Sequence, residues 1–251
     1  MKNPLSMKGK CILITGASSG IGRSCAQILS QLGAIVRISG RNQNRLKECL
    51  ASLTGIGHLA FPYSLENFEG IDLWLDSIVN EGKLDGLVHC AGKLLVRPIK
   101  AISIADYKSL MNVNIDSAFI LAKSFRRRNI HNPNASIVFV SSVAGITGQA
   151  CHSAYSTSKA ALLGLSKSLA AEFISDKIRV NCVLPGYVRS EMYDEMSRTL
   201  TSDQIESIEH SHPLGLGKVE DVAFAISYLL SDIARWVTGS NLIIDGGYSA
   251  V

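Results

Sequence analysis

The sequence predicts an α/β fold in which one doubly wound parallel sheet of about seven strands carries helices on both faces. Short apolar runs alternate with longer segments of helical period along the whole chain. This alternation is typical of βαβ units joined by right-handed crossovers. The apolar runs are continuous in Val, Ile and Leu, as expected of strands that are buried on both faces of a parallel sheet. A glycine-rich turn follows the first run directly, where a doubly wound sheet binds phosphate groups.

The predicted strands are the seven apolar runs at residues 11–15, 35–39, 59–63, 86–90, 137–141, 180–184 and 242–244. Apolar spacing of helical period predicts helices over residues 23–31, 116–126, 154–173 and 219–230. Because no long linker or internal repeat interrupts this order, we expect one domain over residues 1–251. Residues 190–212 are a polar, helical insertion after a strand end, which is a natural place for a lid or a substrate-recognition element.

The composition favours a globular protein. Of the 251 residues, 47% are hydrophobic and 18% are charged, which is enough for a sizeable core and argues against disorder. The net charge of +4 is scattered, apart from the run Arg126-Arg127-Arg128. We favour a solvated helix end for this run, and the alternative is a docking patch for an acidic partner. Without interleaved aromatic residues or a recognition motif, it does not indicate nucleic-acid binding.

The six cysteines are dispersed, with no CxxC pair and no Cys/His cluster at metal-ligand spacing. This pattern predicts reduced thiols and no metal site. The N-terminal segment leads into an apolar run that is too short for a signal peptide, and no stretch approaches the length needed to span a bilayer. We therefore expect a cytoplasmic protein that does not bind membranes.

The glycine-rich turn at residues 15–22 has the sequence TGASSGIG and joins the first predicted strand to a helix. Glycines at such a turn let the backbone approach a pyrophosphate, which the free N–H groups and the helix dipole attract. The spacing is GxxxGxG, and a turn that serves only close helix–strand packing is the alternative. Its place on the first strand favours a dinucleotide site made by Gly16, Ser18, Ser19, Gly20, Ile21 and Gly22.

The end of the second strand indicates which dinucleotide binds. A carboxylate at this place would bind the adenosine ribose 2′-hydroxyl of NAD. The chain has Gly40 and then Arg41 there. With no acid to repel a 2′-phosphate and a guanidinium able to pair with one, the sequence favours NADP(H) over NAD(H). The alternative is that Arg41 is an ordinary loop cation.

Tyr155 and Lys159 are candidate catalytic residues at the start of the long predicted helix. Four residues apart, their side chains share one helix face. A phenol with its usual pKa of about 10 is a poor acid–base catalyst near neutrality, and a nearby cation lowers that pKa. Ser142 lies thirteen residues upstream at the carboxyl end of a predicted strand, where its hydroxyl could bind a carbonyl oxygen. Its neighbour Ser141 is a candidate for capping the next segment.

On these residues the chain resembles the short-chain dehydrogenase/reductase family, whose domain is of the Rossmann type. The turn at residues 15–22 matches the family's TGxxxGIG motif, and Asn114 matches its active-site Asn. Residues 219–223 and 238–247 match its C-terminal signatures. The family's catalytic trio corresponds to Ser142, Tyr155 and Lys159, and its nicotinamide-contacting segment corresponds to Pro185, Gly186, Val188 and Ser190, with Ser190 in place of the commoner Thr.

The resemblance implies an NAD(P)-dependent oxidoreductase that moves a hydride between nicotinamide and a carbonyl or alcohol substrate. Tyr155 would exchange a proton with the substrate oxygen, which Ser142 would polarise. Lys159 would lower the pKa of Tyr155 and bind the nicotinamide ribose, and Asn114 would position a water for a proton relay. No metal is required. Family members usually form homotetramers, partly through the helix that bears Tyr155 and Lys159.

The chain departs from the family pattern at two places. The usual NNAG after the fourth strand is His89-Cys90-Ala91-Gly92, in which Ala91 and Gly92 keep the close backbone approach to the cofactor but both amides are gone. We expect His89 to be a packed residue and Cys90 to be a small buried filler. Residues 62–64 read Pro-Tyr-Ser where the family often has an Asp that contacts adenine, so that contact is altered or lost.

The pattern is closest to bacterial beta-ketoacyl-acyl-carrier-protein reductases, for which the arginine run would attract an acidic carrier protein. Against this, the long helix carries Ala170-Ala171-Glu172 where those reductases tend to place an Arg. Family members that act on sugars, steroids or small ketones fit as well, and we assign specificity to residues 93–102 and 190–212. A dinucleotide-sensing protein without turnover is an alternative of another class, which the retained Tyr155 and Lys159 disfavour.

Overall fold

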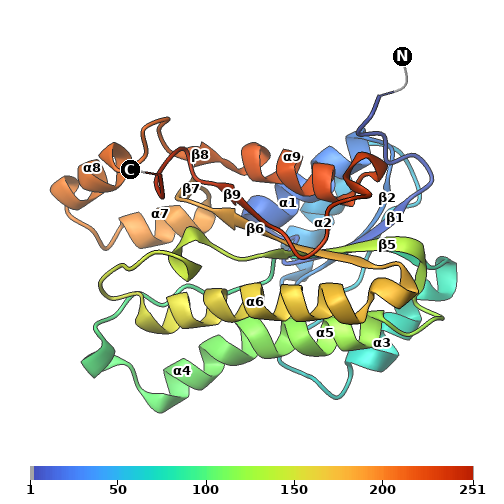
Figure 1. Ribbon diagram of the computed structural model, residues 1–251, viewed down its shortest axis with the longest axis horizontal. Helices are drawn as coiled ribbons and strands as arrows, with labels where there is room; N and C mark the ends of the chain where they lie inside the picture. Colours follow the sequence, from blue (N-terminus) through green and yellow to red (C-terminus); the bar gives the residue numbers. More distant parts are fainter. Residues whose placement is uncertain (1–2, 251) are drawn as a thin grey trace.

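In the computed structural model, which describes residues 3–250, a seven-stranded parallel sheet lies between two helical layers (Figure 1). The strand order is β3-β2-β1-β4-β5-β6-β9, so the chain moves outward in one direction and then returns past β1 to build the other half. This confirms the predicted doubly wound α/β fold. The strands are β1 Cys11–Thr15, β2 Ile35–Ser39, β3 Leu59–Ala60, β4 Leu84–His89, β5 His131–Val140, β6 Arg179–Pro185 and β9 Asn241–Ile244.

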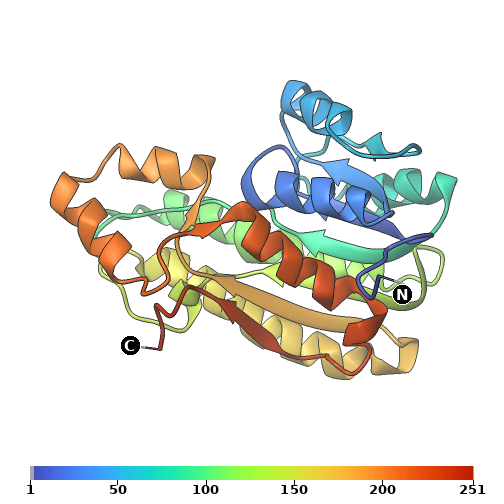
Figure 2. The same ribbon diagram turned by 90° about the horizontal axis from the view of Figure 1, so that it is seen from above.

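Helices cover both faces of the sheet (Figures 1 and 2). Successive strand residues alternate between two apolar cores, with Ile12 and Ile14 in one and Leu13 in the other. Both faces of each central strand are therefore buried, which explains the continuous apolar runs. One core includes α1 Gly20–Gln31, α2 Gln43–Ala51 and α9 Val219–Leu230, and the other includes α3 Ile71–Ile78, α5 Ser117–Phe125 and α6 Ser153–Glu172.

The strands β1, β2 and β4 end at the same level in the sheet, at the point where the direction of winding reverses. Thr15 at the end of β1 pairs in register with Ser39 of β2 and with His89 of β4. In open α/β sheets ligands bind at this switch point, outside the carboxyl ends of the strands. The register therefore brings the ends of β1, β2 and β4 together as the floor of a binding crevice.

The largest differences from the sequence prediction are two strand boundaries and three helices. The strand predicted at residues 59–63 ends at Ala60, because Pro62 has no N–H for the ladder, although Tyr63 still donates to the Gly40 carbonyl. The fifth strand begins earlier than predicted. The helices α2, α3 and α4 (Ile104–Met111) were not predicted. The start of α4 carries a local signal, since Ser103 caps it by accepting from the Asp106 N–H at 3.0 Å.

The predicted polar insertion at residues 190–212 contains two helices, α7 Glu191–Ser197 and α8 Ser202–His210. They project at one end of the molecule (Figures 1 and 2). A short ladder between β7 Val188–Arg189 and β8 Gly217–Lys218 joins the two ends of this segment. Its base is therefore fixed while its helices extend outward.

Two further expectations can be compared with the structure. All six cysteines are free thiols, and three of them are buried. Across residues 3–250, every helix is too short or too polar to cross a membrane.

Candidate active site

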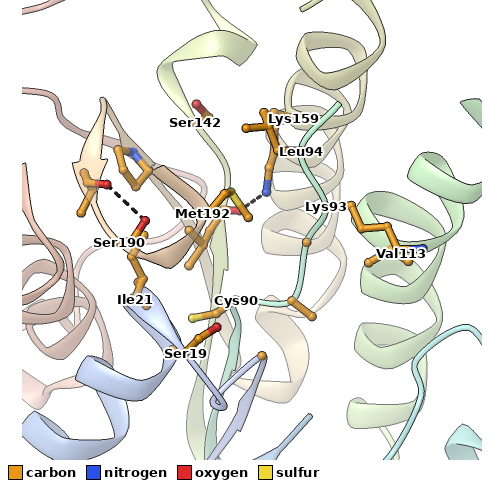
Figure 3. A pocket seen from close by; sticks show the side chains of 18 of the residues that line it. Ser19, Ile21, Cys90, Lys93, Leu94, Val113, Ser142, Lys159, Ser190 and Met192 are labelled. Atoms are coloured by element: carbon orange, nitrogen blue, oxygen red, sulfur yellow. Dashed lines mark hydrogen bonds between the residues drawn. The ribbon is translucent and has the colours of Figure 1, made fainter. Parts of the chain in front are cut away.

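One cavity of about 320 Å³ opens at the carboxyl ends of the strands (Figure 3). All of the residues predicted to bind the cofactor line it, and so do Ser142, Tyr155 and Lys159. Asn114, the fourth predicted catalytic residue, lies behind the wall and is fully buried. The residues that were predicted to bind the cofactor, and that all line the cavity, are Gly16, Ser18, Ser19, Gly20, Ile21, Gly22, Arg41, Ala91, Gly92, Tyr155, Lys159, Pro185, Gly186, Val188 and Ser190.

The glycine-rich turn lies at one end of the cavity. Gly16 has φ +67°, and a Cβ there would lie 2.7 Å from the Ala91 nitrogen, so only glycine allows this close approach to the loop after β4. Ser19 is the N-cap of α1 and makes no side-chain capping bond. Instead, the Gly20 N–H donates to the Glu191 carboxylate of α7 at 2.8 Å. A carboxylate oxygen therefore lies at the N-terminus of α1. The free N–H groups and the dipole of a helix N-terminus attract anions, including phosphate groups.

A charge cluster lies at the adenosine end of the cavity. The Arg41 guanidinium is two-thirds exposed and lies 4.0 Å from the Glu66 carboxylate, while the Lys93 ammonium donates to the same carboxylate oxygen at 2.6 Å. The hydrogen bond from Lys93 lowers the pKa of Glu66, so this side chain is charged. The sequence analysis missed Glu66, because three different loops bring these groups together and no local pattern signals the pairing.

The segment after β3 still lines the cavity although it lacks the expected Asp. Tyr63 is part of the wall, and its ring stacks on Trp74 with 4.7 Å between the ring centroids. The Tyr63 hydroxyl donates to the Asn67 carbonyl at 2.6 Å. Where the family often has an Asp, this chain therefore has an aromatic side chain in the cavity wall. The Tyr63 ring is held by stacking on Trp74 and by the hydrogen bond of its hydroxyl to Asn67.

The predicted catalytic side chains converge from β5 and α6. Tyr155 and Lys159 lie one turn apart on α6, and the Lys159 ammonium lies 5.7 Å from the centroid of the Tyr155 ring. The ammonium donates to the Val140 carbonyl at 2.8 Å, and Figure 3 shows it pointing into the cavity. Ser142, two residues further along the chain than Val140, lines the cavity beside them. The spacing in the sequence is therefore converted into one group of side chains.

The capping role that we expected for Ser141 belongs to Ser142 in the structure. Ser142 caps the short turn that follows by accepting from the Ala144 N–H at 3.2 Å. Ser141, the expected cap, instead donates to the Lys159 carbonyl at 2.8 Å and is buried. The reason is geometric, because alternate residues of an extended chain point to opposite sides. Ser141 therefore anchors α6 against the sheet.

The expected lowering of the Tyr155 pKa by Lys159 is not found. Desolvation raises the pKa of Tyr155 to about 12, and hydrogen bonding to Ser142 opposes this rise only in part. Desolvation lowers the pKa of Lys159 to about 8, close to the physiological range. Burial outweighs the attraction between the two groups because the ammonium is directed at the Val140 carbonyl. Tyr155 is therefore a protonated phenol, and Lys159 is the group that titrates near neutrality.

Asn114 lies in a single π-helical turn, Asn112–Asp116, between α4 and α5. Such turns occur often at functional sites. Its Oδ1 accepts from the Lys93 N–H at 2.7 Å, and its Nδ2 donates to the Lys93 carbonyl at 3.0 Å and to Ser158 Oγ at 2.9 Å. These bonds link the loop after β4 to α6. The contacts of Asn114 are thus with backbone and a serine, rather than with the cavity itself.

His89 and Cys90 differ in their positions although they are neighbours. His89 is buried outside the cavity lining, as expected for a packed residue. Cys90, expected to be a buried filler, is half-buried and forms part of the cavity wall (Figure 3). Desolvation raises the pKa of the Cys90 thiol to about 12, so it is a neutral group in that wall.

The other end of the cavity contains residues that we missed as well as residues from the predicted specificity segments. Gln149 donates to the Tyr187 hydroxyl at 2.7 Å, and both line the cavity with His152. These three residues lie outside residues 93–102 and 190–212. No local pattern predicts Gln149 and His152, because the loop after Ser142 carries no recognisable chemistry. Tyr187, in contrast, lies between Gly186 and Val188 of the predicted nicotinamide-contacting segment. The predicted segments contribute Leu94, Met192, Tyr193 and Met196.

The arginine run directly follows α5, as expected for a helix end. Arg126 donates to Asp176 at 2.7 Å, and Arg127 lies 3.2 Å from Asp76. Two of the three arginines therefore pair with carboxylates of this chain, which favours the helix-end interpretation over a docking patch.

Comparisons with known proteins find relatives over nearly the whole chain. A family model described as Enoyl-(Acyl carrier protein) reductase matches residues 16–249. The 3-oxoacyl-[acyl-carrier-protein] reductase FabG of Rickettsia felis is 35% identical over 244 residues, which cover 97% of this chain and 98% of the relative. An uncharacterized oxidoreductase of Thermotoga maritima is 36% identical over 98% of this chain and its own full length. A short-chain type dehydrogenase/reductase from Mycobacterium ulcerans has a similar structure, with a TM-score of 0.91, 29% identity, and coverage of 98% of this chain and 91% of its own.

The fold and the cavity thus define an oxidoreductase on a doubly wound α/β scaffold. The family match spans nearly the whole chain, and relatives above 30% identity align over almost their full length. The chain belongs to the short-chain dehydrogenase/reductase family.

Proposed function

We propose that the chain is an NADP-dependent reductase of 3-oxoacyl groups carried as thioesters on acyl carrier protein. The observation that carries this proposal is that one cavity joins an anion-binding glycine turn to Ser142, Tyr155 and Lys159, with Arg41 at its far end. Relatives named 3-oxoacyl-[acyl-carrier-protein] reductase, 35% identical to the chain, support the substrate class.

The cofactor in this proposal is NADP(H), which supplies the hydride when bound. The contact of Glu191 with the Gly20 N–H supports the fit, because a carboxylate oxygen accepts from this N–H at 2.8 Å. Arg41 would bind the 2′-phosphate. The pyrophosphate would bind along Gly16, Ser18, Ser19, Gly20, Ile21 and Gly22, and the remaining contacts would come from Ala91, Gly92, Tyr155, Lys159, Pro185, Gly186, Val188 and Ser190.

Glu66 bears directly on the preference for NADP. A carboxylate near Arg41 could repel a 2′-phosphate or bind the ribose hydroxyls of NAD. Its oxygen lies 2.6 Å from the Lys93 ammonium but 4.0 Å from Arg41, so its charge is paired mainly with Lys93. Arg41 is left exposed and loosely held, which supports its assignment as the cation that binds the 2′-phosphate.

For catalysis, we assign the proton transfer to Tyr155. During reduction Ser142 would hydrogen-bond the substrate oxygen and Tyr155 would donate its proton to that oxygen. Because burial raises the pKa of Tyr155 to about 12, the phenol is protonated and ready to donate throughout the physiological range. The charged Lys159 would stabilise the phenolate that proton transfer leaves behind, and it would also bind the nicotinamide ribose.

A polar pair at the substrate end is compatible with a second candidate substrate class. The hydrogen-bonded Gln149 and Tyr187 offer an amide and a phenol to a substrate group beyond the reacting carbonyl. A thioester carbonyl fits that description, and so does a hydroxyl group of a sugar or another small polar ketone.

The experiment that tests the proposal is titration of the purified protein with NADPH and with NADH, followed by turnover with a panel of ketones. The panel contains a 3-oxoacyl thioester, a sugar ketone, a steroid ketone and a simple ketone. We expect the protein to bind NADPH more tightly than NADH and to oxidise NADPH fastest when the 3-oxoacyl thioester is the substrate. If another ketone is turned over faster, the proposed substrate class is wrong and that ketone indicates the correct one. If the protein binds the cofactor but reduces none of the ketones, the dinucleotide-sensing alternative is favoured.

We also propose a homotetramer in the cytoplasm. The helix α6 leaves small residues such as Ala160 and Gly164 exposed, next to α5 with its exposed Phe119, and such a surface suits helix packing between copies. The free thiols of all six cysteines favour a reducing compartment. Light scattering at micromolar concentration should give about four times the monomer mass, and a monomer would contradict the assembly.

A further inference from the structure

A buried histidine lies between the cofactor end and the catalytic end of the site without lining the cavity. His89 is the last residue of β4, is 1% exposed, and pairs in register with Thr15 of β1 and Phe139 of β5. A titratable ring in this position costs free energy unless its polar atoms are bonded. Its hydrogen-bond partners therefore indicate what the ring does.

The partners of His89 fix its tautomer. Thr15 Oγ1 lies 3.0 Å from Nδ1, and Ser117 Oγ lies 3.5 Å from Nε2. The Ser117 hydroxyl donates its own proton to the Val113 carbonyl at 2.7 Å, so its oxygen can only accept from the ring. Nε2 therefore carries the proton and Nδ1 accepts from Thr15. The result is a directed chain of hydrogen bonds from Thr15 through His89 and Ser117 to Val113.

The two ends of this chain are parts of the site. Thr15 is the residue directly before Gly16 of the glycine turn, and Val113 directly precedes Asn114 in the π-helical turn. From Asn114 the bonds continue, because its Nδ2 donates to Ser158 Oγ at 2.9 Å. Ser158 Oγ in turn donates to the Tyr155 carbonyl at 2.7 Å. A buried network thus joins the phosphate-binding turn to the helix of the catalytic tyrosine.

We propose that His89 is a positioning residue, whose neutral ring couples the glycine turn to the Asn114 turn and, through Ser158, to Tyr155. The inference rests on the proposed function of the cavity. The family usually has an Asn at this position. Its side-chain amide could accept from Thr15 and donate to Ser117 in the same pattern. Desolvation and the charge of Lys159 lower the pKa of His89 to about 3, so the pattern is kept throughout the physiological range.

Five variants test the coupling, with kcat for the ketone substrate and Kd for NADPH measured on each. His89→Leu should lower kcat and raise Kd, each about tenfold, because it removes both bonds. His89→Asn should recover most of both losses. Thr15→Val should mainly raise Kd, and Ser117→Ala should mainly lower kcat. His58→Leu is the matched control, since its ring also bridges two groups, the Val36 N–H and the Thr54 carbonyl, away from the cavity.

The outcomes separate a positioning role from simple packing. If His89→Leu changes neither constant, or if Thr15→Val and Ser117→Ala alter the two constants in the same proportion, the coupling is wrong. If His89→Leu does not fold, His89→Asn and the two hydroxyl variants still decide the question.

A measurement that does not depend on activity separates this inference from the proposed function. Two-bond ¹H–¹⁵N correlation of the histidine rings should assign a proton to Nε2 of His89 and no titration between pH 5 and 9. An Nδ1–H tautomer or a titrating ring would overturn the network even in an active enzyme. The expected tautomer in a protein that does not reduce ketones would leave the network standing and reject the function instead.

Discussion

The two ends of the cavity are built in different ways. The cofactor end is formed by the carboxyl ends of paired strands and by a glycine turn in which Gly16 has no room for a side chain. The substrate end is formed by loop residues such as Gln149 and Tyr187 and by side chains of α7. Backbone geometry therefore defines the first end, and side-chain identity defines the second. This difference explains why a cofactor class is easier to infer than a substrate.

The largest expected effect lies where the two ends meet. Tyr155→Phe removes the proton donor without changing the shape of the wall, so kcat should fall by about 10³-fold. The Kd for NADPH should stay within about twofold. Tyr107→Phe, on the partly exposed surface of α4, is the matched control and should keep full activity. Turnover by Tyr155→Phe at more than a tenth of the wild-type rate would exclude Tyr155 as the donor.

The adenosine end should respond strongly to charge. Arg41→Met should raise the Kd for NADPH about thirtyfold and leave the Kd for NADH unchanged, since only NADP carries the 2′-phosphate. Glu66→Gln should act in the opposite direction and tighten NADPH binding. Arg45→Met on α2 is the control, because it removes an exposed cation from outside the cavity. Fluorescence titration of each variant with NADPH and with NADH measures these Kd values.

An opposite result at this end would be equally informative. If Glu66→Gln weakens NADH binding and Arg41→Met has no effect on NADPH, then Glu66 binds the ribose hydroxyls and the enzyme prefers NAD. The charge cluster would then hold a carboxylate for the ribose, with Lys93 orienting it.

The fold class and the seven strands could be predicted, because strand burial and helix periodicity are local signals. The strands β1 and β2 have the predicted bounds, and α9 does too. The short polar helix α2 could not be predicted from periodicity, because little of it is buried. Its stability comes from capping by Asn42 and from packing of Leu46 on the sheet.

The candidate site was predicted where a motif fixes a spacing, and missed where distant loops meet. Tyr155 and Lys159 share a helix, so their separation alone places them together. Glu66 and Arg41 lie on different loops, and only the folded chain brings them within 4.0 Å. The pKa of Tyr155 could not be predicted either, because burial and not the nearest cation decides it.

The catalytic end should show a pH dependence that comes from Lys159. Burial lowers its pKa to about 8, so the ammonium is present below that pH and is lost as the pH rises. Tyr155, with its pKa near 12, stays protonated over the same range. The initial rate of ketone reduction at saturating NADPH should therefore be level below pH 8 and fall about tenfold per pH unit above it. Lys159→Arg should remove this fall, and a wild-type rate that is constant up to pH 10 would show that the charge of Lys159 is not required.

The smallest expected effect concerns Glu191, whose carboxylate reaches the glycine turn from the substrate end. Glu191 of α7 accepts from the Gly20 N–H at 2.8 Å, so it competes with a pyrophosphate for the same donor. Glu191→Gln should tighten NADPH and NADH binding equally, by about threefold, because both cofactors share the pyrophosphate and a helix terminus attracts charge only moderately. Glu195→Gln, on the exposed side of the same helix, should change neither. Weaker binding by Glu191→Gln would instead make Glu191 a support for the bound cofactor. In that case α7 belongs to the cofactor end of the cavity as well as to the substrate end.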